Sequence, residues 1–165
     1  MKTNIVLIGL SGVGKTTIAM ELSRVLNMPY IDSDTVIEED YGSIPELFKI
    51  GEGHFRQIER KVIKLLSSLD RIIIATGGGV VLVPENIEAL REKGILFYIK
   101  RSIEDIINSI DASKRPLLKG NPIENLNNLY TQRSHLYEDA SDYTIDASNM
   151  QDAISSIRSI WDKIS

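Results

Sequence analysis

The stretch GLSGVGKT, Gly9 to Thr16, directly follows the apolar run Ile5 to Ile8. It matches the pattern G-x-x-x-x-G-K-[ST] in full, and a segment with helical periodicity comes after it. Glycines in such a loop let backbone N–H groups approach an anion at the start of a helix, where the helix dipole already favours negative charge. The stretch therefore predicts a buried strand, a phosphate-binding loop and a helix.

Beyond this stretch, short apolar runs alternate with longer amphipathic segments, which is typical of βα units that feed a parallel sheet. We predict an α/β protein with three layers, in which helices flank a five-stranded parallel sheet. The predicted strands are Ile5 to Ile8, about Pro29 to Ile31, Ile72 to Ala75, Ile95 to Ile99 and Tyr143 to Ile145.

Size and composition restrict the class of protein. The 165 residues are 42% hydrophobic and 25% charged, and no linker-like tract interrupts them, so we expect one domain over residues 1–165. A net charge of -4 argues against a nucleic-acid partner, which calls for a basic surface. The sequence has no cysteine for a disulfide, and its first apolar run is too short to span a bilayer. We expect a cytoplasmic monomer with no membrane partner.

The phosphate-binding loop predicts a nucleotide ligand. Lys15 is expected to place its charge on the β- and γ-phosphates, and the hydroxyl of Thr16 is expected to ligate Mg²⁺. A glycine-rich turn with an accidental lysine is the alternative, and the flanking strand and helix argue against it. The residues predicted to bind ATP in this loop are Gly9, Ser11, Gly12, Val13, Gly14, Lys15, Thr16 and Thr17.

The end of the third predicted strand narrows the class of nucleotide-binding protein. Motor and switch NTPases usually present an acid there, whereas the run from Ile72 to Thr76 leads into three glycines, Gly77 to Gly79. The guanine signature N-K-x-D is also missing from the sequence. These two observations favour a kinase that acts on a small molecule.

The acids that such a kinase needs are found in DSD, Asp32 to Asp34, just after the second predicted strand. Residues i and i+2 of an extended segment project to the same side, so both carboxylates are expected to face the crevice at the carboxyl ends of the strands. One carboxylate is suited to hold the water shell of a metal ion, and the other is suited to accept the proton of a substrate hydroxyl. Alternatively, Ser33 or Asp34 caps a helix, and both interpretations can hold together.

Taken together, the motifs resemble those of shikimate kinase over essentially the whole chain. The resemblance implies transfer of the γ-phosphate of ATP to the 3-hydroxyl of shikimate, a step toward chorismate and the aromatic amino acids. It also implies a nucleoside-monophosphate-kinase-like fold, with a substrate-binding segment at about 32–61 and a mobile lid at about 112–123. The motifs in the family's order are GLSGVGKT, DSD, GEGHFRQIE (Gly51 to Glu59), ATGGGV (Ala75 to Val80), RPLL (Arg115 to Leu118) and YTQRSHLYEDASDYTID (Tyr130 to Asp146).

The resemblance also implies a role for each site residue. Asp34 matches the residue that hydrogen-bonds the acceptor hydroxyl and serves as its base, and Asp32 matches the acid on the metal side. Arg115 matches a lid arginine that reaches ATP and the transferring phosphoryl group. The catalytic set that the resemblance implies consists of Lys15, Asp34 and Arg115.

Two arginines are implied to grip the carboxylate of shikimate, namely Arg56 and Arg133, with backbone N–H groups of Gly77 to Gly79 nearby. A planar guanidinium can form two parallel hydrogen bonds with a carboxylate, which supports these roles, although either arginine could equally be a solvated charge. Glu59 lies three residues after Arg56 on the same helical face and could orient it. The chain departs from the family at one position: Asn108 stands where family members often carry an arginine that stacks on adenine.

Two other functions remain open from the sequence. One is a kinase of the same fold that acts on another polyol or sugar acid, as a gluconate kinase does. The other is a regulatory protein that binds ATP without turnover.

Overall fold

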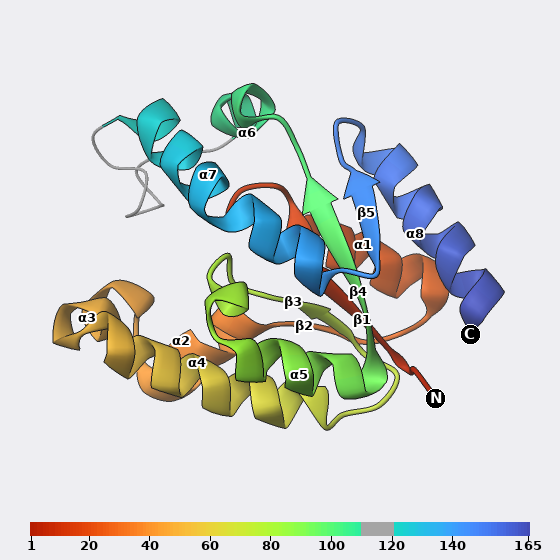
Figure 1. The fold of residues 1–165 in the computed structure, drawn as a ribbon. Coiled ribbons are helices and arrows are strands. Elements are labelled where there is room, and N and C mark those ends of the chain that lie inside the picture. Colours follow the sequence, from red (N-terminus) through yellow and green to blue (C-terminus); the bar gives the residue numbers. More distant parts are fainter. Residues whose placement is uncertain (110–120) are drawn as a thin grey trace.

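The structure is a computed structural model that describes residues 1–109 and 121–165. Arg115 and most of the predicted lid, about 112–123, lie outside the described residues. Five strands form one parallel sheet in the order β2-β3-β1-β4-β5 (Figure 1). The predicted α/β architecture is confirmed, and the strands are β1 (Asn4–Ile8), β2 (Tyr30–Asp32), β3 (Ile73–Ala75), β4 (Gly94–Lys100) and β5 (Tyr143–Asp146).

Helices cover both faces of this sheet. Helices α1 and α8 contact each other on one side, whereas α5 and α7 pack against β4 from the other (Figure 1). No helix within the two described ranges is long and apolar enough to cross a membrane. The helices are α1 (Lys15–Leu26), α2 (Ser33–Tyr41), α3 (Ile44–Ile50), α4 (Glu52–Ser67), α5 (Pro84–Lys93), α6 (Ile103–Ser109), α7 (Pro122–Ala140) and α8 (Met150–Ile164), with a short 3₁₀ helix at Val80–Leu82.

The core consists of the strands and the apolar faces of the helices. Every residue of β1 and β3 is buried, as expected for central strands that carry helices on both faces. Helix α1 contributes Ile18, Ala19 and Leu22 to this core. The near-continuous apolar runs in the sequence are therefore explained by burial on two faces of the sheet.

The strand order brings three loops together at one edge of the sheet. Strands β2, β3 and β1 are neighbours, with Asp32 opposite Ala75 and Ala75 opposite Leu7. The DSD stretch, the triglycine loop (Gly77 to Gly79) and the phosphate-binding loop follow the ends of these strands, so the three loops line one crevice. Ligands of open α/β sheets bind at such a place, outside the carboxyl ends of the strands.

Candidate active site

The phosphate-binding loop has the backbone conformation that its glycines permit. Gly9, Gly12 and Gly14 have φ angles of +145°, +88° and +103°, in the region that other residues rarely adopt. Helix α1 begins directly after Gly14, and no side chain caps its first turn. N–H groups at the start of such a helix are suited to an anion.

Lys15 and Thr16 open helix α1 and face the crevice. The Lys15 side chain is buried, and its ammonium group donates hydrogen bonds to the carbonyl oxygens of Gly9 and Leu10. The Thr16 hydroxyl donates a hydrogen bond to the Asp32 carboxylate. A hydroxyl and a carboxylate oxygen therefore meet beside the loop, which is the donor chemistry that Mg²⁺ prefers.

The structure corrects one detail of the DSD prediction. Asp32 ends β2 and is itself the cap of helix α2, because its Oδ1 accepts hydrogen bonds from the N–H groups of Asp34, at 2.9 Å, and Thr35, at 3.3 Å. Neither Ser33 nor Asp34 is the cap, and Asp34 lies in the first helical turn rather than in an extended segment. Both carboxylates still line the same cavity, because the chain turns sharply between strand and helix.

Asp34 lies in a cavity of about 140 Å³ at this edge of the sheet. Burial is the main cause that raises the pKa of its carboxyl to about 6, and the negative charges of Asp32 and Glu59 add to the effect, whereas Lys15 opposes it. A carboxyl group that titrates near neutral pH is suited to proton transfer. The cavity is lined by Ser11, Gly12, Gly14, Lys15, Thr16, Thr17, Asp32, Asp34, Thr76, Gly77 and Gly78.

Each glycine of the triglycine loop abuts a different functional side chain. A Cβ atom on Gly77 would lie 2.6 Å from Oδ1 of Asp34, and one on Gly79 would lie 2.6 Å from Cζ of Arg56. A Cβ atom on Gly78 would lie 3.0 Å from Oγ of Ser11 and 3.7 Å from Nη1 of Arg133. Space, rather than backbone conformation, therefore explains the three glycines.

Arg56 extends from α4 to the triglycine loop. Its Nη1 lies 2.8 Å from Oε1 of Glu59, and its Cζ lies 5.1 Å and 5.7 Å from the ring centroids of Phe55 and Phe48. Glu59 is buried, and this burial raises the pKa of its carboxyl, whereas Arg56 and then Arg133 lower it. The expected orienting pair is present, and its burial distinguishes it from an exposed surface pair.

Arg133 of α7 is also buried and completes a cluster with Arg56 and Glu59. Within the described part of the chain, Nε of both arginines and Oε2 of Glu59 are buried without a hydrogen-bond partner. Buried polar atoms are usually paired, so orphaned atoms beside a cavity indicate a place for a ligand or water. Two guanidinium groups make an anionic ligand the better fit.

Some contacts of the site were not predicted from the sequence. Ser33 is fully buried, and its Oγ accepts a hydrogen bond from the N–H of Gly77 at 3.2 Å. The hydroxyl of Tyr137 donates a hydrogen bond to the carbonyl oxygen of Gly78. A signal for Tyr137 exists in the sequence, because it lies four residues after Arg133 and so on the same face of a helix. Asn108, which stands where family members often carry the arginine that stacks on adenine, is exposed on α6.

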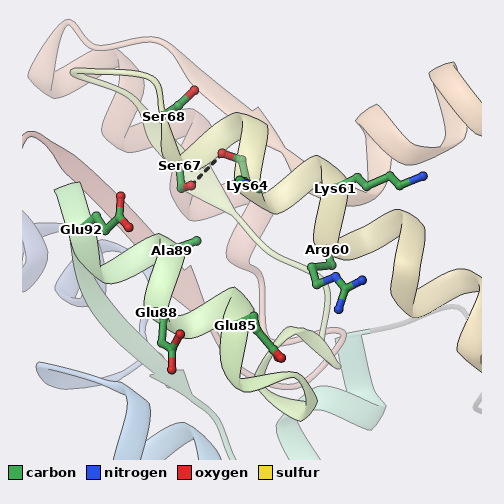
Figure 2. A pocket seen from close by; sticks show the side chains of 9 residues that line it. All are labelled: Arg60, Lys61, Lys64, Ser67, Ser68, Glu85, Glu88, Ala89 and Glu92. Carbon is green, nitrogen blue, oxygen red and sulfur yellow. Dashed lines mark hydrogen bonds between the residues drawn. The ribbon is translucent and has the colours of Figure 1, made fainter.

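A larger hollow, of about 640 Å³, lies between α4 and α5 (Figure 2). Helix α4 contributes Arg60, Lys61 and Lys64 to it, and α5 contributes glutamates. None of the predicted site residues lines this hollow. The small cavity at the ends of the strands is therefore the candidate active site.

Fold and site together define a P-loop kinase that acts on a small molecule. The shikimate kinase family model matches residues 11–164. A shikimate kinase of Clostridium botulinum (strain Eklund 17B / Type B) is 41% identical over 162 residues, which cover 97% of this chain and 98% of that protein. The chain belongs to the shikimate kinase family, and it is an ATP-dependent kinase.

Solved structures agree with this assignment. A shikimate kinase from Acinetobacter baumannii in complex with shikimate matches with a TM-score of 0.93 and 33% identity, over 100% of this chain and 96% of that chain. A shikimate kinase from Aquifex aeolicus matches with a TM-score of 0.80 and 29% identity, over 97% and 96% of the two chains. The predicted family and fold are confirmed.

Proposed function

We propose that this chain transfers the γ-phosphate of ATP to the 3-hydroxyl of shikimate, a step of chorismate and aromatic amino acid biosynthesis. One observation carries the proposal: the half-buried Arg56 abuts Gly79 and the buried Arg133 abuts Gly78, and Gly77 and Gly78 of the same loop line the cavity that holds Asp34 and Lys15. Such a site offers two guanidinium groups to a carboxylate and one carboxylate to a hydroxyl. Shikimate carries both groups, and family membership supports the same substrate.

The phosphate-binding loop is proposed to hold the tail of ATP. N–H groups of the loop and of the first turn of α1 would surround the phosphates, while Lys15 would exchange its carbonyl contacts for the β- and γ-phosphates. Gly9, Gly12 and Gly14 adopt positive φ angles that residues with a side chain rarely adopt, so the loop keeps its shape only with glycine at these positions. The contribution of Arg115 to the same phosphates stays a prediction.

Mg²⁺ is proposed to bind at Thr16 and Asp32. Both are hard oxygen donors, and no group of three or more His, Cys, Asp or Glu side chains among residues 1–109 and 121–165 offers another metal site. Few protein ligands are expected, because Mg²⁺ in kinases also takes oxygens from phosphates and water. When bound, the ion neutralises charge on the phosphates.

Asp34 is proposed to accept the proton of the 3-hydroxyl. As the hydroxyl oxygen forms its bond with the γ-phosphorus, the bond from that phosphorus to the bridging oxygen breaks, and ADP leaves. Arg56 and Arg133 would hold the carboxylate of shikimate at the far end, with the N–H groups of the triglycine loop beside them. Positioning and charge supply most of the catalysis in such a transfer.

The test is a coupled assay of ADP release with purified protein and Mg²⁺-ATP. We expect turnover with shikimate and little or none with quinate, gluconate or nucleoside monophosphates. Preference for gluconate would replace the proposal with a sugar-acid kinase, and ATP binding without any turnover would replace it with a regulatory role. We further propose, in line with the expectation from the sequence, that the protein acts as a cytoplasmic monomer.

A further inference from the structure

Tyr137 lies directly behind the triglycine loop. It is fully buried on α7, and its ring stacks on that of Tyr98 in β4, with a centroid distance of 5.1 Å. Its hydroxyl donates a hydrogen bond to the carbonyl oxygen of Gly78. Because one turn of helix separates Tyr137 from Arg133, the same face of α7 contacts the loop through both side chains.

The bond to Gly78 fixes the orientation of a whole peptide group. The carbonyl of Gly78 and the N–H of Gly79 belong to one planar trans peptide, in which the two bonds point in opposite directions. Anchoring the carbonyl on Tyr137 therefore directs the N–H of Gly79 away from α7. Within the described part of the chain, that N–H donates to no protein acceptor, although Gly79 abuts the guanidinium of Arg56.

The Tyr137 hydroxyl remains a donor at every pH at which the protein would work. Burial raises the pKa of Tyr137 to about 12, even though the charge of Arg133 and a side-chain hydrogen bond from Arg133 to the Tyr137 hydroxyl act in the opposite direction. A glycine-rich loop has little intrinsic preference for one orientation of its peptide groups. The Tyr137 hydroxyl, which stays protonated on a rigidly packed ring, can favour one orientation of the Gly78–Gly79 peptide.

We propose that Tyr137 is a positioning residue for the acceptor: it holds the Gly78–Gly79 peptide so that the N–H of Gly79 is presented, beside Arg56, to an oxygen of shikimate. The inference rests on the proposed function, because it takes shikimate as the molecule in the crevice. Tyr137 itself does not touch the reacting atoms. Its effect reaches the substrate through the backbone of the loop.

The experiment compares the wild type with Tyr137→Phe, which keeps the stacked ring and removes the hydroxyl. Loss of one neutral hydrogen bond predicts an increase in KM for shikimate of about 3- to 10-fold, with kcat and KM for ATP within about 2-fold of the wild type. Tyr98→Phe is the matched control, because it removes a hydroxyl from the partner ring, and we expect wild-type kinetics. Replacing Tyr137 with 4-aminophenylalanine, which restores a donor at the same place, is expected to recover KM.

All assays are run well below the lowest unfolding midpoint of the variants, so that each is folded. An unchanged KM for shikimate in Tyr137→Phe would overturn the inference, as would equal changes in both KM values or the same change in Tyr98→Phe. These results differ from failure of the proposed function, which would appear as absence of shikimate turnover in the wild type and would remove the inference with it.

Discussion

The Asp34 carboxyl combines burial with two negative neighbours, Asp32 and Glu59, and Lys15 offsets them. Ionisation of Asp34 is therefore unfavourable in the folded protein. Only the ionised carboxylate, however, can accept a proton from the substrate. Active sites often contain carboxyl groups whose pKa is shifted in this way, and burying their charge lowers the stability of the folded state. Activity and stability should consequently respond in opposite directions to replacement of this side chain.

We expect Asp34→Asn to lower kcat by about 100-fold or more, because a well-placed general base contributes at least that much. The KM for ATP should change less, since Asn keeps the shape of the cavity. In the wild type, kcat/KM for shikimate should fall as pH drops below about 6, where the folded carboxyl gains its proton. Wild-type turnover in Asp34→Asn would remove the proposed base.

The same substitution should raise stability at neutral pH. The pKa is raised from 3.8 to about 6, so the folded state binds the proton more tightly, and this contribution is lost as pH rises through that window. Above pH 6, Asp34→Asn should therefore be more stable by about 3 kcal/mol, a gain that shrinks by about half at pH 5. Urea unfolding at both pH values measures it, and an equal gain at each would contradict the assigned cause.

At the scale of the elements, helix α2 and the proposed metal site share Asp32. One carboxylate oxygen caps the helix through Asp34 and Thr35, while the other accepts from Thr16. Asp32→Asn keeps a good capping residue, whereas Asp32→Ala removes it at a cost of about 1 kcal/mol. We expect both variants to need more Mg²⁺ for half-maximal activity, but only Asp32→Ala to lose stability. Unchanged Mg²⁺ dependence in both would exclude Asp32 as a metal-side acid.

The triglycine loop makes a second prediction at this scale. A Cβ atom on Gly79 would collide with the Arg56 guanidinium, which is held by Glu59 and cannot retreat without breaking a buried ion pair. Gly79→Ala should raise KM for shikimate about 10-fold or more, because displacing the guanidinium weakens a charge-assisted hydrogen bond. Gly53→Ala is the control, since an added Cβ there has nothing within 4 Å and lies in a helix. Equal KM values in the two variants would contradict this explanation of the loop.

These elements show which parts of the site were predictable. Local motifs predicted the phosphate-binding loop, the acids and the orienting contact of Glu59, because each depends on residues close in sequence. The reason for three consecutive glycines depends on Asp34, Ser11 and Arg56, which reach the loop from three other segments. The cap at Asp32 was missed because the strand ends one residue later than predicted. Burial of Glu59 follows from tertiary packing, which periodicity alone does not determine.

At the scale of the whole molecule, the sheet order places the two proposed recognition sites in one crevice. The proposed ATP site begins at the end of β1, whereas the proposed acceptor site is completed by Arg56 of α4 and Arg133 of α7. The two sites meet at Asp34 and the triglycine loop. Binding energy at each site should therefore be separable by mutation, although both ligands stabilise the same fold.

Thermal unfolding with each ligand tests this separation. A ligand at 100 times its Kd stabilises a protein by about 2.7 kcal/mol, which for a chain of this size raises the midpoint by about 5 to 10 °C. Arg133→Lys should lose most of the shift with shikimate and keep the shift with Mg²⁺-ATP, because an ammonium group cannot replace the guanidinium fork. Lys15→Met should show the reverse. If either variant lost both shifts equally while remaining folded without ligand, the two sites would act as one unit, and assignment of the arginine pair to the acceptor alone would be wrong.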